Sequence, residues 1–103
     1  MRLRSRDKTF RAIVEKKMED LRRQRGTDFS YMPPFSSKTL QFQEKPAKLH
    51  THKIELDDGR ICVKVTLSQL RFKDYVEVYA EDGLVVSKDG VKREMTPDLW
   101  ELF

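Results

Sequence analysis

The chain has 103 residues, of which 37% are charged, and a formal net charge of +4. This length predicts one domain with a modest core, and the lone Cys62 excludes an internal disulfide. No run approaches the roughly 18 apolar residues of a membrane span, and no apolar stretch follows the first arginines as in a secretory signal. We therefore expect an intracellular protein, in the cytoplasm or nucleus, that makes no membrane contact.

Residues 1–26 are predicted to form a basic helix. Ser5 or Asp7 is placed to cap it, Gly26 is placed to end it, and it runs to about Gln24. Its apolar residues recur at spacings of three and four, which predicts one stripe that packs on the sheet: Phe10, Ile13, Val14, Met18 and Leu21.

Positive charge is concentrated in this segment. Residues 1–25 hold ten Lys or Arg against four Asp or Glu, a formal charge of +6, which leaves −2 for residues 26–103. A basic segment on a slightly acidic body favours an anionic partner, with a solvated helix face as the equally weighted alternative. The candidate nucleic-acid-binding residues are Arg2, Arg4, Arg6, Arg11, Lys16, Lys17, Arg22, Arg23 and Arg25.

Residues 27–50 are predicted to be an irregular arm. Pro33 and Pro34 cannot donate to a ladder, so residues 30–37 are expected to be loop or extended chain. The alternation around Leu40 and Phe42 predicts a short strand that ends at Pro46. Apolar side chains of the arm are expected to plug one edge of the core. The alternative is that they dock a partner protein, and the candidate docking residues are Phe29, Tyr31, Met32 and Phe35.

Residues 51–95 predict an antiparallel sheet built from Asp-Gly hairpins. A two-residue loop at 58–59 places Leu56 opposite Ile61, and Ile54 opposite Val63, on one apolar face. The opposite face then carries Lys53, Glu55, Cys62, Lys64 and Thr66.

Residues 68–74 are predicted to be a connection between two hairpins, and the second hairpin is predicted around residues 81–83. As a three-residue loop with Gly83 in the left-handed region, it places Ala80 opposite Leu84. Both Gly59 and Gly83 are therefore expected to have positive φ. A further turn at 89–90 returns residues 91–95 as a last short strand, and residues 96–103 are expected to form a C-terminal helical turn that Thr96 and Pro97 begin.

The chain has no pattern typical of catalysis, so we expect a non-enzyme without cofactor or metal. His50 and His52 form a His-x-His pair, but the predicted register places Cys62 on the opposite face, which leaves two ligands without a third. The four glycines are spread among turns and caps, so no phosphate-cradling loop is present.

Two short runs resemble known families. Residues 61–65, 72–78 and 82–87 are similar to the middle strands of small heat-shock proteins of the α-crystallin type, which form a β-sandwich, although its second half has no counterpart here. Residues 96–102, Thr-Pro-Asp-Leu-Trp-Glu-Leu, are similar to a Thr-Pro-Gly-Leu-Trp/Tyr-Glu-Leu tail in uncharacterised open reading frames of large DNA mobile elements, with Asp98 in place of the Gly. The second resemblance implies no biochemical activity.

Together these patterns predict one small α+β domain over residues 1–103. The basic N-terminal helix packs on an antiparallel sheet of four to five strands, and a short helical turn follows. The predicted function is binding without catalysis. The basic helix contacts an anionic partner, and the backbone of nucleic acid is the first candidate. Acids such as Glu77 on the sheet disfavour base stacking there, so the contacts are expected to go to phosphates. The alternative is a protein-interaction or chaperone-like module that pairs through a sheet edge or the arm at 29–35.

Overall fold

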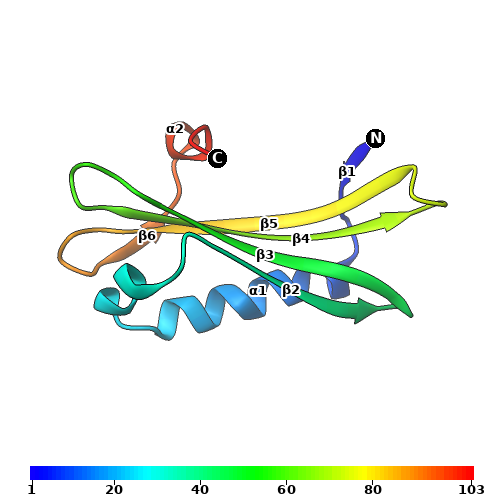
Figure 1. Ribbon diagram of the computed structural model, residues 1–103, viewed down its shortest axis with the longest axis horizontal. Helices are drawn as coiled ribbons and strands as arrows, with labels where there is room; N and C mark the ends of the chain where they lie inside the picture. Colours follow the sequence, from blue (N-terminus) through cyan, green and yellow to red (C-terminus); the bar gives the residue numbers. More distant parts are fainter.

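The computed structural model describes residues 1–103 and shows an elongated α+β domain of about 45 × 25 × 22 Å (Figure 1). One sheet runs along the long axis, and a helix lies along one of its faces. In chain order the elements are β1 (Arg2–Arg4), α1 (Lys8–Arg23), the 3-10 helix η1 (Gly26–Tyr31), β2 (Phe35–Phe42), β3 (Lys45–Glu55), β4 (Ile61–Arg71), β5 (Val76–Val86), β6 (Lys92–Glu94) and α2 (Pro97–Trp100).

The sheet is mixed and mostly antiparallel, with six strands in the order β1-β5-β4-β3-β2 and with β6 also on β5. The three long central strands and β2 are antiparallel hairpin neighbours, whereas β1 pairs parallel to β5. The predicted fold class is thus confirmed: a basic N-terminal helix on a sheet, followed by a short C-terminal helical turn. The sheet has six strands instead of the expected four to five, because residues 2–4, expected in the helix segment, form β1.

Helix α1 begins and packs as its sequence predicts. Asp7 is the N-cap, and its Oδ1 accepts hydrogen bonds from the backbone N–H groups of Thr9 at 2.9 Å and Phe10 at 3.3 Å. The helix ends at Arg23, and Gly26 begins η1 instead of capping α1. A side chain at Gly26 would lie 2.5 Å from the Cα of Gly90, so glycine allows the close approach of the 89–90 turn.

The predicted register of the first hairpin is wrong by one residue. Glu55 pairs with Ile61 and Lys53 with Val63, because the loop has three residues, 57–59, closed by a hydrogen bond from the N–H of Leu56 to the carbonyl of Arg60. Gly59 has φ +90°, as predicted. An odd loop length exchanges the two faces of β3. His50, His52 and Ile54 therefore share a face with Cys62, while Lys53 faces the helix.

The second predicted hairpin is also wrong. Residues 81–83 lie inside the continuous strand β5, and Gly83 pairs with Lys64 without positive φ. The turn between β4 and β5 lies at residues 72–75, where Phe72, Lys73 and Asp74 have φ of 54°, 56° and 70°. The predicted connection at 68–74 is therefore too long at its start, because residues 68–71 belong to β4 and no glycine marks where the turn begins.

The arm at 27–50 is more regular than predicted. Its first part is η1, and its second part forms the hairpin of β2 and β3, which turns at Gln43 and Glu44. Pro46 lies within β3 and does not end a strand. A proline is tolerated there because β3 pairs only with β2 at that point, since its pairing with β4 begins at Lys48.

Both faces of the sheet are covered, by two separate hydrophobic clusters. The larger cluster joins α1 and η1 to the helix-facing side of the sheet and includes Phe10, Phe29, Val65 and Leu67, all fully buried. The smaller cluster lies on the opposite side, which we call the open face, where Leu99 of α2 covers Cys62 and Val85. A single sheet with these two covers differs from the two-sheet sandwich of α-crystallin proteins. No helix has the length and apolarity required to cross a membrane.

Candidate nucleic-acid interface

The outer side of α1 presents the basic residues that the sequence predicted to bind phosphates. The apolar stripe is buried against the sheet: Phe10, Val14, Met18 and Leu21 are at most 3% exposed. The remaining faces are therefore left to solvent. Exposed cationic side chains on or next to the helix are Arg6, Lys8, Arg11, Lys16, Arg22, Arg23 and Arg25, whereas Lys17 is half-buried beside the stripe.

These helix cations form no ion pairs. No carboxylate oxygen lies within the 4.0 Å ion-pair distance of a Lys or Arg on α1, although Glu15, Glu19 and Asp20 are on the same helix. An unpaired exposed cation has lost little hydration and is free to contact a phosphate. The acids on the helix weaken the positive potential around it, but they form no ion pairs with its cations.

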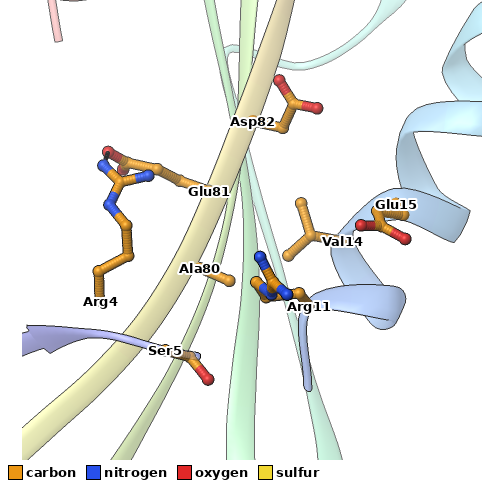
Figure 2. A pocket seen from close by; sticks show the side chains of 8 residues that line it. All are labelled: Arg4, Ser5, Arg11, Val14, Glu15, Ala80, Glu81 and Asp82. Atoms are coloured by element: carbon orange, nitrogen blue, oxygen red, sulfur yellow. Dashed lines mark hydrogen bonds and ion pairs between the residues drawn. The ribbon is translucent and has the colours of Figure 1, made fainter. Parts of the chain in front are cut away.

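A hollow of about 230 Å³ lies where β1 passes the start of α1 along β5. Figure 2 shows Arg11 on the α1 side of β5 and Arg4 turned toward Glu81 on the other side. Ser5 is buried at the base, and its backbone N–H donates to the carbonyl of Tyr79 at 2.7 Å. A neighbouring hollow adds Arg6 to the same corner, so three arginines gather around the first turn of the helix.

The structure removes Arg2 and Arg4 from the set of free cations. Arg2 lies 3.6 Å from the carboxylate of Glu77, and Arg4 lies 3.4 Å from that of Glu81. Both guanidinium groups also lie over the ring of Tyr79, at 3.7 and 5.3 Å. These two residues hold β1 on the sheet, so their charge is already partly neutralised.

The N-terminus of α1 is not itself an anion site. The carboxylate of Asp7 occupies the N–H groups of Thr9 and Phe10, and its charge opposes a second anion there. Any phosphate contact in this region depends on side chains, above all those of Arg6 and Arg11.

The four residues proposed for protein docking do not form one surface. Phe29 is fully buried in the core, where it plugs one edge as the preferred interpretation expected, and Met32 is half-buried. Tyr31 is 88% exposed at the end of η1. Phe35 is half exposed on the open face, where its ring stacks on His50 at 5.5 Å and lies tilted against His52 at 4.8 Å.

The histidines share the open face with Cys62, contrary to the predicted register. Even so, no group of three His, Cys, Asp or Glu side chains could hold a metal ion. Burial lowers the pKa of His52, and the nearby charges of Lys64 and His50 lower it further. Burial raises the pKa of the Cys62 thiol. A buried thiol of raised pKa is a poor nucleophile.

Sequence reasoning missed a second basic group, at the end of the sheet where the β2–β3 and β4–β5 hairpins turn. Its cations come from the first residues of β3, the end of β4 and the following turn: Lys45, Lys48, Arg71 and Lys73. A connection at 68–74 was predicted, but the group forms only through the pairing of β3 with β4, which the sequence did not show.

Comparison of the chain with protein-family models, with curated proteins and with solved structures found no match.

Proposed function

We propose that this protein is a non-enzymatic binding module that contacts the phosphate backbone of nucleic acid through the outer face of α1. The residues that carry the contact are Arg6, Arg11, Lys16, Arg22 and Arg23. Relative to the set expected from the sequence, Arg2 and Arg4 are reassigned to holding β1, and Lys17 and Arg25 flank the surface.

The observation that supports this proposal most is the separation of apolar and cationic side chains on α1. One side of the helix is fully buried, and the other sides carry cations without ion-pair partners. Cations that serve only the fold would be expected to pair with acids of the sheet, as Arg2 and Arg4 of β1 do with Glu77 and Glu81. Contacts of this kind position a protein on nucleic acid and carry no sequence information.

Fluorescence anisotropy with labelled DNA and RNA at several salt concentrations tests the proposal. The variant Lys16→Gln, Arg22→Gln, Arg23→Gln removes three exposed cations from the face. If each contacts one phosphate, the slope of log affinity against log salt should fall by about 2 to 3 units, at roughly 0.7 to 0.9 per contact. Circular dichroism should be unchanged, because exposed charges contribute little to stability.

A matched control is available elsewhere on the surface. The variant Lys38→Gln, Arg60→Gln, Arg93→Gln removes the same number of positive charges from β2, the β3–β4 loop and β6. It should leave the salt slope close to that of the native protein. Equal effects of the two variants, or no binding by the native protein at about 50 mM salt, would contradict the proposal.

A second candidate function is protein interaction through the edge of the sheet. Strand β2 is an eight-residue edge strand that pairs only with β3, and neither a proline nor a helix protects its outer edge. An extended strand of a partner, such as a second copy of the chain, would add to it by main-chain hydrogen bonds. Light scattering across protein concentration tests self-pairing, which should persist from about 50 to 500 mM salt; a monomer at every concentration contradicts it.

A further inference from the structure

The tip of the β4–β5 hairpin is both strained and exposed. Three consecutive residues without the freedom of glycine, Phe72, Lys73 and Asp74, have positive φ, which costs free energy. The rings of Phe72 and Tyr75 are 71% and 78% exposed. Aromatic side chains usually contribute to folding by burial, so the strain at this tip is not offset by packing of its rings.

A hollow of about 380 Å³ lies beside this tip, between the start of β3 and the end of β4. Four cationic side chains line it, those of Lys45, Lys48, Arg71 and Lys73, together with two acids, a formal charge of +2. One of the acids, Glu77, already faces Arg2 at 3.6 Å, so Asp74 is the only acid there without a cation partner. The hydroxyl of Ser68 adds a polar group to the lining.

We propose that this hollow and the hairpin tip bind unpaired nucleotides, so that the nucleic acid recognised by this protein is single-stranded. The proposal rests on the function proposed above and specifies its ligand. Lysine side chains in the hollow contact phosphates, and the rings of Phe72 and Tyr75 stack on bases. A duplex cannot use these rings in the same way, because its bases are already stacked within the helix.

The hollow and α1 lie close enough to act on one strand. The guanidinium of Arg71 lies 5.4 Å from the ring centroid of Phe10, in the first turn of α1. In Figure 1 the start of α1 and the two hairpin tips lie at the same end of the molecule. A single strand held at the tip can therefore continue past Arg6 and Arg11 onto the outer face of the helix.

Stacking is tested by removing the rings. Anisotropy titrations at about 50 mM salt compare a labelled oligo(dT) with a duplex of the same length. The native protein should prefer oligo(dT), and the variant Phe72→Ala, Tyr75→Ala should bind it about tenfold more weakly or worse, with duplex binding unchanged. The control Tyr31→Ala, which removes a ring that is 88% exposed on η1, should leave both affinities unchanged.

A second variant separates stacking from general hydrophobic contact. Phe72→Leu, Tyr75→Leu keeps apolar side chains at the tip but removes the flat rings, and it too should lose the preference for oligo(dT). If this variant still binds oligo(dT) like the native protein, stacking is wrong. Binding to phosphatidylserine vesicles that is lost in the alanine variant and kept in the leucine variant would instead assign the tip to a bilayer surface.

The inference and the proposed function can fail separately. If native protein binds oligo(dT) and duplex equally, or if the alanine variant matches the native protein while the triple α1 variant is weakened, the tip proposal is overturned and the function proposed for α1 stands. If the native protein binds neither nucleic acid, the function itself fails, and the tip proposal falls with it.

Discussion

At the scale of single residues, Gly59 and Gly83 have different physical roles. Gly59 has φ +90°, and an added Cβ would make only ordinary contacts with Lys88. Gly83 has no positive φ, but an added Cβ would lie 2.7 Å from the carbonyl oxygen of Val63 and 3.2 Å from the ring of Trp100. Glycine is required at 59 for the turn, and at 83 because the carbonyl of Val63 and the side chains of Met95 and Trp100 leave no room for a Cβ.

The two alanine variants should therefore differ in kind. Gly59→Ala is expected to destabilise the protein by about 1 kcal/mol, the free energy of placing a Cβ in the left-handed region. Gly83→Ala should cost about 1 to 3 kcal/mol through overpacking and should also shift the fluorescence emission of Trp100. Denaturant unfolding and emission spectra measure both effects. A native-like midpoint and spectrum for Gly83→Ala would contradict the packing observed here.

His52 should make stability depend on pH. Its pKa in the folded protein lies below the ordinary value of 6.5, because of burial and of the charges of Lys64 and His50. The unfolded chain then binds the proton more readily than the folded one, so stability is full above pH 6.5 and falls as pH drops through the folded pKa.

Urea unfolding at about pH 7.5 and about pH 5.5 tests this expectation. The native protein should lose more stability on acidification than His52→Gln, which cannot bind the proton. His50→Gln serves as the comparison on the same face. An identical loss in native protein and His52→Gln would show that other groups carry the pH dependence.

At the scale of elements, local patterns predicted the helix and most of the strands, but not β1 and not how the strands pair. The stripe from Phe10 to Leu21 and the cap Asp7 act within a few residues, so sequence alone identifies α1. The register of β3 depends on whether the loop has two or three residues, and Asp58-Gly59 is compatible with both. That one-residue difference moved Lys53 to the helix side and the histidines to the open face.

One part of the candidate site could be predicted from the sequence and another part could not. The basic face of α1 could be predicted, because 3.6-residue periodicity leaves one side of a helix to solvent once the apolar side is buried. The hollow near Lys45 and Lys73 could not be predicted, since residues distant in the sequence meet there only after the strands pair. The connection predicted over residues 68–74 includes most of the turn at 72–75, but without a glycine or proline the sequence did not show that β4 continues to Arg71.

Lys53 connects η1 to the sheet and should be important for stability. Its Nζ is buried and donates to the carbonyl oxygens of Phe29 at 3.3 Å and Ser30 at 3.2 Å, and it lies 3.0 Å from a carboxylate oxygen of Glu55. Lys53→Met keeps the apolar stem but leaves those carbonyls without their donor, which should cost about 1 to 3 kcal/mol. The exposed Lys38→Met on β2 should stay within roughly 0.5 kcal/mol of the native protein. Equal unfolding free energies for the two variants would contradict this role.

At the scale of the whole molecule, the sheet separates two hydrophobic clusters that contact it from opposite sides. The larger one holds α1 and η1, and with them the proposed binding face. The smaller one is formed by Cys62, Val85 and Leu99, with Leu56, Met95 and Phe103 packed around them. Because the strands lie between the clusters, the smaller one can open without disturbing α1.

The single cysteine reports directly on that opening. In the native protein Cys62 is fully buried and its thiol pKa is raised by burial, so it should react slowly with a disulfide reagent such as Ellman's. Leu99→Ala removes a buried side chain from the cluster and should lower stability by about 2 kcal/mol or more. Labelling of Cys62 should then be about tenfold faster or more, since each 1.4 kcal/mol changes an opening equilibrium tenfold.

The control is Leu102→Ala, which truncates a side chain that is 49% exposed on the same segment and should leave the labelling rate close to native. The decisive comparison is between labelling and circular dichroism in Leu99→Ala across urea concentration. Independent clusters predict rapid labelling while the helical signal of α1 is still complete. If labelling accelerates only in step with loss of that signal, the two clusters unfold as one cooperative unit, and the C-terminal segment is part of the fold that holds the binding face.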